Sequence, residues 1–313
     1  GTLTLTDGTG LASNYSLSSG TFDINSRQVN IAGSRIYDGT TSANGSDLIV
    51  TTGVGSEILT VTGTGSISNA NVGNNKAVTT GTLALSSGSG NASNYQLGTI
   101  TLSVTERPVN IDLEKIYDAT TNAAGSDLKA NGITNTVLGH SLTLNGTGTM
   151  TSGVGVDKSV TIGTLSLSGT QASNYTLTGG NHTIDVTPRT TNASGSRHYD
   201  GSLSVRGSDF NNFTNIVGSD TVTLSGTGTI TTNSSVGPKG VSLGTLASAH
   251  PNYILGSASM TVTQRPVSLR GSRIADGNLV VDANELSISN LASGENLTLA
   301  GSGSINASSP GTS

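Results

Sequence analysis

The sequence contains no cysteine and no tryptophan, and only 3% of its 313 residues are aromatic. Without a thiol there is no disulfide, thiolate nucleophile or zinc–thiolate site, so stability must come from packing alone. Lysine and arginine together number 14 against 19 acids, which leaves a phosphate-binding surface without its positive charge. We therefore predict no nucleic-acid partner. No apolar stretch approaches the roughly 18 residues of a spanning helix, and we predict no membrane span in this segment.

Charged residues are scarce as well, at 11% of the chain. Disorder of the usual kind needs low hydrophobicity and high net charge, whereas 33% of these residues are apolar and the formal net charge is -5. Most of the apolar residues are valine, leucine and isoleucine in short alternating runs. The composition therefore predicts a folded chain with a buried core.

What the sequence does contain is an internal repeat with a period of about 80 residues. A Tyr-Asp block begins each copy, a Gly-Thr-Gly block follows, and an Asn-Tyr block comes near the end. The blocks keep one order throughout. We predict the C-terminal part of a repeat at 1–26, whole repeats at 27–106, 107–188 and 189–264, and the N-terminal part of a repeat at 265–313.

Within each repeat the apolar residues alternate with polar ones, as in Ile100, Leu102 and Val104, which typically places one face of a strand in a core. The short strands are separated by Gly, Asn and Ser, and Pro108, Pro188 and Pro266 mark the boundaries. We predict an all-β fold, a tandem array of small antiparallel β-sandwich (Ig-like) repeats forming an elongated rod. The alternative is a β-solenoid, whose rungs would show a period of about 20 to 25 residues.

All seven tyrosines fall in two repeat positions, the Tyr-Asp block and the Asn-Tyr block. An aromatic binding platform would gather several rings on one exposed face, whereas one or two rings at fixed points are typical of core anchors. We predict structural anchors at Tyr15, Tyr37, Tyr95, Tyr117, Tyr175, Tyr199 and Tyr253.

Two acidic positions also recur, nine residues apart. Paired carboxylates invite a calcium hypothesis, because Ca²⁺ needs several oxygen ligands. The turn-forming role of aspartate is the favoured alternative, because its side chain bonds to backbone N–H groups two residues further on. The Ca²⁺ candidates are Asp38, Asp47, Asp118, Asp127, Asp200 and Asp209, with Asp276 and Glu285 at the same positions of the last copy.

No residues form a catalytic set. The four histidines, His140, His182, His198 and His250, occupy different repeat positions, and no nucleophile elbow opens a helix. The Gly-Thr-Gly strings lead into strands rather than into the helix that a phosphate loop requires. We predict that the protein is not an enzyme and that it has no catalytic or cofactor-binding residues.

The order Arg-Pro-Val, I-Y-D-G-T-T, G-S-D-L, G-T-G, N-V-G-N-N-K, G-T-L and A-S-N-Y resembles the YDG-type repeats of large secreted bacterial adhesins. Those exoproteins are of the two-partner-secretion kind, similar to filamentous haemagglutinin and the high-molecular-weight adhesins. The departures are Ala119 for the glycine, Arg189-Thr190 for Arg-Pro, and Ala275 for the tyrosine. The resemblance implies export by an outer-membrane partner transporter and a place at the bacterial cell surface.

From these observations we expect a stalk or spacer segment of a large surface or secreted adhesin that supports cell–cell, biofilm or host attachment. Two alternatives remain open. One is a polysaccharide-binding module in which repetition gives avidity. The other is a self-assembling extracellular filament or sheath in which strand edges of like chains pair.

Overall fold

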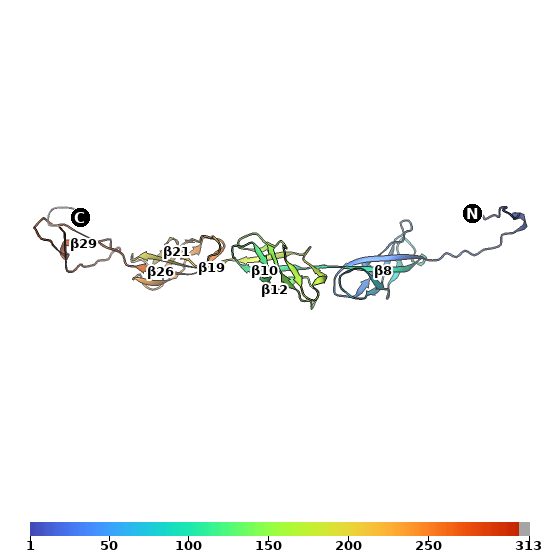
Figure 1. The fold of residues 1–313 in the computed structure, drawn as a ribbon, viewed down its shortest axis with the longest axis horizontal. Coiled ribbons are helices and arrows are strands. Elements are labelled where there is room, and N and C mark those ends of the chain that lie inside the picture. Colours follow the sequence, from blue (N-terminus) through green and yellow to red (C-terminus); the bar gives the residue numbers. More distant parts are fainter. Residues whose placement is uncertain (307–313) are drawn as a thin grey trace. The chain divides into compact units, whose positions relative to one another are not determined.

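The computed structural model describes residues 1–306 and is built almost wholly of strands and turns (Figure 1). Its helical segments are seven single 3-10 turns, of which Gly45–Asp47 (η2) and Ala92–Asn94 (η3) are examples. The all-β class predicted from the sequence is therefore confirmed. Residues 307–313, at the end of the predicted copy 265–313, lie outside the described part.

The described residues divide into two compact units. The first comprises 1–109, 134–143 and 167–180, and the second comprises 110–133, 144–166 and the residues from 181 onward. We call the segments 27–106, 107–188 and 189–264 repeats 1, 2 and 3. Repeats 1 and 3 lie each within one unit, whereas repeat 2 contributes to both.

Repeat 1 forms a curled six-stranded sheet in the order β2-β5-β6-β8-β1-β3, with β4 and β7 paired beside it. Repeat 3 forms the same sheet in the order β20-β23-β24-β26-β19-β21, with β22 and β25 as the extra pair. The strands of repeat 1 are β1 (Arg27–Ile36), β2 (Ser42–Asn44), β3 (Leu48–Val50), β4 (Leu59–Thr62), β5 (Thr64–Ile67), β6 (Gly73–Thr79), β7 (Ala84–Ser87) and β8 (Tyr95–Thr105). Those of repeat 3 are β19 (Arg189–His198), β20 (Ser204–Arg206), β21 (Phe210–Phe213), β22 (Leu224–Ser225), β23 (Thr227–Ile230), β24 (Gly237–Ser242), β25 (Ala247–Ser248) and β26 (Tyr253–Thr263).

Repeat 2 and the C-terminal segment use the same strand positions with more breaks. In repeat 2 the strands are β9 (Arg107–Pro108), β10 (Asn110–Ile116), β11 (Asn122–Ala124), β12 (Leu128–Thr134), β13 (Thr143–Asn145), β14 (Thr147–Thr149), β15 (Gly155–Ser159), β16 (Ser166–Ser168), β17 (Tyr175–Thr176) and β18 (His182–Thr187). In the C-terminal segment they are β27 (Ser268–Gly271), β28 (Val280–Asp282), β29 (Leu286–Ser289) and β30 (Ser302–Ser304).

The prediction of purely antiparallel pairing is wrong. In each whole repeat a strand near the N-terminal boundary pairs in parallel with the last strand, β1 with β8, β10 with β18 and β19 with β26. The physical reason is the chain path, because both strands run from the Asn-Tyr end of the repeat to the Tyr-Asp end. In repeat 1, for example, Arg27 lies opposite Tyr95, and Ile36 lies opposite Thr105. The strands of each six-stranded sheet come from one repeat, so these sheets do not form the continuous coil that a β-solenoid requires.

The alternation of apolar and polar residues in the strands determines which side chains lie in the core. Ile100, Leu102 and Val104 on β8 are buried, as the period of two predicted, and Val29 and Ile31 on β1 are buried beside them. In repeat 3 the core cluster includes Phe210, Met260 and Val262. Burying one such side chain contributes roughly 1.5–3 kcal/mol, which in a chain without disulfides is the main source of stability.

The N-terminal segment 1–26 forms no strand, and Leu3 and Leu5 are exposed. Tyr15 is 70% exposed, so the prediction of an anchor there is wrong. In repeat 1 the corresponding Tyr95 is buried in one cluster with Val29 and Leu59.

Candidate functional site: the junction between repeats

The tyrosine of the Tyr-Asp block and the tyrosine of the Asn-Tyr block meet where one repeat follows another. We call the Tyr-Asp end of a repeat its trailing end and the Asn-Tyr end its leading end. The rings of Tyr37 and Tyr175 lie edge to face, with centroids 5.5 Å apart and an interplanar angle of 82°. Tyr117 and Tyr253 repeat this arrangement at 5.8 Å and 81°. Each pair joins the trailing end of one repeat to the leading end of the next, and T-shaped pairs of this kind contribute about 0.5–1.5 kcal/mol beyond their burial.

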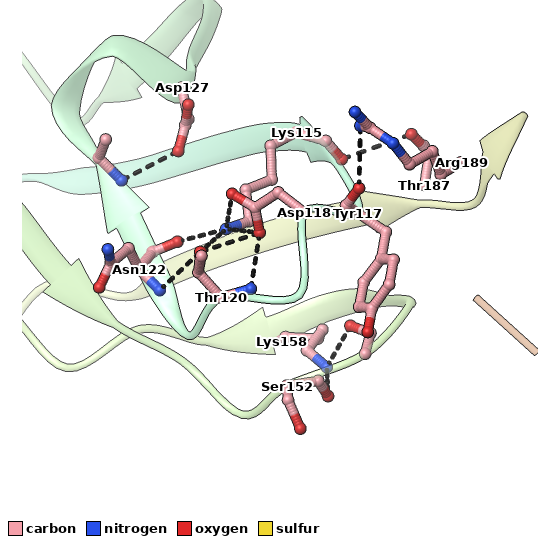
Figure 2. Close-up of polar contacts among 12 residues, drawn as sticks. Lys115, Tyr117, Asp118, Thr120, Asn122, Asp127, Ser152, Lys158, Thr187 and Arg189 are labelled. Carbon is pink, nitrogen blue, oxygen red and sulfur yellow. Dashed lines mark hydrogen bonds and ion pairs between the residues drawn. The ribbon is translucent and has the colours of Figure 1, made fainter. Parts of the chain in front are cut away.

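The trailing tyrosine is held in place by its own backbone. The N–H of Tyr117 donates to the carbonyl oxygen of Thr187 at 2.9 Å, and Tyr37 and Thr105 make the same bond in repeat 1. This bond ties the Tyr-Asp loop to the end of the last strand. Figure 2 shows the trailing end of repeat 2, where the carbonyl oxygen of Tyr117 faces the guanidinium group of Arg189.

Arg107, the arginine that opens repeat 2, binds both sides of the first junction. Arg107 donates from Nη1 to the carbonyl oxygen of Tyr37 at 3.3 Å. Its Nε and Nη2 donate to the carbonyl oxygen and Oδ1 of Asn135, at 2.6 and 2.8 Å. A planar guanidinium with donors on two edges suits this double contact, and a lysine could not reproduce it.

Asn135 is shaped for this contact, because its φ of 63° lies in the left-handed region that asparagine tolerates better than most residues. Its Nδ2 also donates to the carbonyl oxygen of Pro108 at 2.6 Å. At the next boundary Asn215 has a φ of 60° and donates to the carbonyl oxygen of Thr190 at 2.7 Å. The asparagine needs only a backbone carbonyl oxygen from the residue after the arginine. This explains why threonine can replace the expected proline in Arg189-Thr190.

The same contacts occur at the second and third boundaries. Arg189 donates to the carbonyl oxygens of Tyr117 at 3.3 Å and Asn215 at 3.1 Å. Arg265 donates to the carbonyl oxygen of Tyr199 at 3.4 Å and to that of Asn290 at 2.6 Å. The arginine contact is therefore a property of the repeat rather than of one place in the chain.

A second pair of blocks meets beside the tyrosines. The Asn-Tyr asparagine Asn174 is 1% exposed, and its Oδ1 accepts the backbone N–H of Val72 in repeat 1 at 2.9 Å. Asn252 accepts the N–H of Val154 in repeat 2 at the same distance. A buried amide would be costly without partners, and Asn174 also donates to Gln171 and Asn71. The Asn-Tyr motif therefore supplies two contacts to the preceding repeat.

A lysine organises the loop that presents this valine. Lys76 Nζ donates to the carbonyl oxygens of Asn69 at 2.7 Å and Asn71 at 2.5 Å. Lys158 makes the corresponding bonds to Ser152 and Gly153, at 2.9 and 2.8 Å (Figure 2). Burial lowers the pKa of Lys76, and the charge of Arg35 lowers it further. These lysines hold the loop in its conformation through hydrogen bonds to its carbonyl oxygens.

The leading tyrosine has its own polar partners. The hydroxyl of Tyr175 accepts the N–H of Val137 at 3.0 Å and lies 2.7 Å from Nδ1 of His140. The hydroxyl of Tyr253 accepts the N–H of Val217 at 3.0 Å and donates to Asp220 at 2.9 Å. Tyr95 donates to Glu57 in the same way.

Glu57, His140, Asp220 and Glu295 share one repeat position, because each donates its backbone N–H to the carbonyl three residues earlier. The sequence prediction that the histidines have no common repeat position missed this relationship for His140. The available signal was the fixed distance of three residues after Val54, Val137, Val217 and Ala292. An acid or a histidine at this position gives the tyrosine hydroxyl an acceptor.

Burial raises the pKa of the Tyr37 hydroxyl, with additional contributions from Tyr175 and Asp38. Burial is also the largest cause for Tyr117 and Tyr253, and Asp220 raises both pKa values further. For Tyr199 the hydrogen bond to Glu295 is the first cause of the raised pKa. Because their pKa values are raised, Tyr37, Tyr117, Tyr199 and Tyr253 stay neutral and can donate hydrogen bonds at ordinary pH.

The seven tyrosines predicted as anchors differ in burial. Tyr37, Tyr95, Tyr117, Tyr175 and Tyr253 are buried, Tyr199 is half-buried, and Tyr15 is exposed. Beyond the anchoring role that the sequence predicted, the rings of Tyr37 and Tyr117 contact Tyr175 and Tyr253 of the next repeat.

The acidic positions form turns in the structure. The first acid caps its own loop, with Asp38 Oδ1 accepting the N–H of Thr40 at 2.9 Å and Asp118 that of Thr120 at 3.0 Å. Asp200 and Asp276 do the same, and all four pair with the cation three residues earlier. The second acid, at Asp47, Asp127, Asp209 or Glu285, accepts the backbone N–H three residues before it.

The two acids of a repeat use their oxygens in separate turns. Within residues 1–306, no three His, Asp or Glu side chains gather as metal ligands would. The Ca²⁺ hypothesis therefore gains no geometric support. Within the same residues, no helix is long and apolar enough to cross a membrane.

The comparison with family models gives one match. The YDG domain model matches residues 24–102 and 104–184, two tandem copies that together make up just over half of the chain. No curated protein matches the chain. The SRA-YDG domain that carries this name is a DNA-binding, 5-methylcytosine-binding domain and not an adhesin repeat. The match therefore corrects the resemblance to secreted adhesin repeats, which was wrong.

Proposed function

From the premise that the chain belongs to the YDG-domain family, we propose that it is a structural spacer. Its repeats, each a small β-sandwich, are joined end to end into an extended row that separates whatever lies on either side. The proposal includes no catalytic step. The adhesin assignment is not part of it.

The observation that carries the proposal is the recurrence of one junction. The arginine contact occurs at three successive boundaries, the tyrosine pair at two, and the asparagine–valine contact at two. A flexible tether needs no such contacts, because its segments should move freely. Contacts that recur at each boundary favour a chain in which neighbouring repeats hold a set orientation.

DNA binding is the second candidate, and it is suggested by the family name. The charges favour the spacer. Lys76 and Lys158 hold loop carbonyls, Lys115 pairs with Asp118, and Lys129 lies between Asp112 and Asp185. Arg107, Arg189 and Arg265 bind within the junctions. Cations used in this way are not available to neutralise phosphates, which is the main source of affinity for DNA.

Two measurements on the full chain test the proposal. Small-angle X-ray scattering should give the same maximum dimension over a range of salt concentrations, and a Tyr37→Ala/Tyr117→Ala chain should show a broader, more variable particle. An electrophoretic mobility shift with methylated and unmethylated duplexes should show no complex. A saturable complex that favours 5-methylcytosine would replace the spacer with the DNA-binding candidate.

The remaining expectations stay predictions with their own tests. A saturable interaction with a purified surface polysaccharide would favour the binding-module alternative. Laterally fused fibres in negative stain would favour the filament alternative. Localisation at the cell surface, and passage through an outer-membrane transporter, are tested by labelling intact cells with an antibody against the chain.

A further inference from the structure

The residue after Tyr-Asp is the point at which successive junctions differ. Gly39, Ala119 and Gly201 all have left-handed backbones, with φ of 78°, 63° and 77°. Glycine adopts this conformation without strain, whereas alanine does not. Repeat 2 nevertheless has alanine here, so the facing surface of repeat 3 should show what accommodates the extra methyl group.

At the first junction the facing residue leaves no room for a methyl group. A Cβ added to Gly39 would lie 2.8 Å from Cγ1 of Val137, closer than side-chain carbons approach one another. Val137 cannot move away freely, because its N–H donates to the hydroxyl of Tyr175. The trailing end of repeat 1 therefore accommodates Val137 only because the residue after Tyr37-Asp38 is a glycine.

At the second junction the facing loop has a different turn. In repeat 2 the left-handed glycine of this loop is Gly139, and in the C-terminal segment it is Gly294, with φ of 83° and 82°. In repeat 3 it is Gly218, one residue earlier in the repeat, with a φ of 60°. A Cβ on Gly218 would lie 3.1 Å from the real Cβ of Ala119. The displaced glycine is what faces the alanine.

The third boundary resembles the first, because a glycine again follows Tyr-Asp, but the residue that faces this glycine is smaller. Ala292 takes the place of Val137, and a Cβ on Gly201 would lie 3.8 Å from its Cβ, which is ordinary contact. The three boundaries thus have three combinations of small and large residues. Of the two glycines that follow Tyr-Asp, Gly39 has no room for a methyl group, whereas Gly201 does.

We propose that adjoining repeats are matched to each other, so that a repeat placed beside a different neighbour would not pack against it through these facing residues. The partner that each trailing end fits is the leading end with the complementary loop: Gly39 takes the loop of Val137, and Ala119 takes the loop of Gly218. The proposal goes beyond a spacer role, because a spacer could be built from interchangeable repeats. It concerns neighbour choice and holds or fails whether or not the chain serves as a spacer.

A double-mutant cycle in the full chain tests the match at the first junction. The readout is amide hydrogen exchange at Val72, whose N–H is bonded across the first junction, with Val154 at the second junction as internal control. Gly39→Ala should speed exchange at Val72 at least tenfold and leave Val154 unchanged. Adding Val137→Gly to this variant should restore most of the protection of the Val72 amide. Val137→Gly alone should not increase that protection above the wild-type level.

The reciprocal cycle uses the second junction. Gly218→Val should speed exchange at Val154 at least tenfold, and adding Ala119→Gly should recover part of the loss. Ala119 shows that alanine folds at this backbone position, so Gly39→Ala is expected to fold, and the second cycle stands independently of it. The proposal is overturned if Gly39→Ala leaves Val72 protected, or if in both cycles the double variant loses as much as the two single variants combined.

Discussion

The ring edge of one tyrosine meets the ring face of another, Tyr37 against Tyr175, although the two belong to successive repeats. Both side chains are buried, at 2% and 4% exposure, and each is fixed by backbone bonds in its own repeat. The pair therefore transmits the orientation of one repeat to the next. Tyr117 and Tyr253 form the same kind of pair between repeats 2 and 3.

Tyr37→Ala is expected to open the first junction without unfolding either repeat. Removing a buried aromatic ring costs about 3–5 kcal/mol, and most of that loss should fall on the junction. Exchange of the Val72 amide should therefore accelerate by about a hundredfold, since each 1.4 kcal/mol corresponds to a factor of ten. Tyr37→Phe is the matched control and should change little, because the hydrogen bond from the hydroxyl to Gln171 is long, at 3.4 Å.

Arg107→Lys should weaken the first junction because lysine cannot donate to Tyr37 and Asn135 together. Loss of hydrogen bonds from a charged donor costs about 1.5–3 kcal/mol. Val72 exchange should rise while Val154 exchange does not, and Arg189→Lys should give the opposite pattern. Equal changes at both amides for either variant would show that the arginines stabilise the chain as a whole and not one boundary.

Substitutions at His140 should follow the residues found at that position in other repeats. His140→Asp should be tolerated, because Asp220 already accepts the tyrosine hydroxyl at the second junction. His140→Ala leaves the Tyr175 hydroxyl without this partner and should cost about 1 kcal/mol in the thermal unfolding of the first junction. If alanine and aspartate behaved alike, the hydrogen bond to the ring nitrogen would have no structural role.

Acid should destabilise the loops through three aspartates. The hydrogen bond and charge of Lys129 lower the pKa of Asp185. For Asp38 and Asp118 burial raises the pKa, but the hydrogen bonds of Thr40 and Thr120 and the neighbouring cation outweigh it, so the net pKa is lowered. A lowered folded pKa gives stability that is present above the unfolded value of about 3.9 and is lost as the pH falls below it.

Melting temperatures measured between pH 2 and 7 check this expectation. The wild-type chain should lose stability below about pH 4, and Asp185→Asn should reduce that dependence. Asp23→Asn, at an exposed position in the N-terminal segment, is the control. A curve for Asp185→Asn that parallels the wild type would remove Asp185 from the account.

The sequence was sufficient for the features that depend on local patterns. Alternation predicted the buried faces of Ile100, Leu102 and Val104, and the turn chemistry of Asp38 and Asp47 is local hydrogen bonding. The parallel pairing of β1 with β8 was missed, because periodicity shows which face of a strand is buried but not which strand lies beside it. The partner of Tyr37 was missed for the same reason, since it lies in another repeat.

The absence of cysteine makes one measurement especially direct, because two engineered cysteines can carry the only spin labels in the chain. Pulsed electron–electron distance measurements between labels at exposed positions in repeats 1 and 2 test whether the junction fixes neighbouring repeats. We expect one narrow distance distribution in the otherwise unaltered chain and a broad one after Tyr37→Ala and Arg107→Ala. A broad distribution in the otherwise unaltered chain, or a narrow one that survives both substitutions, would contradict the account.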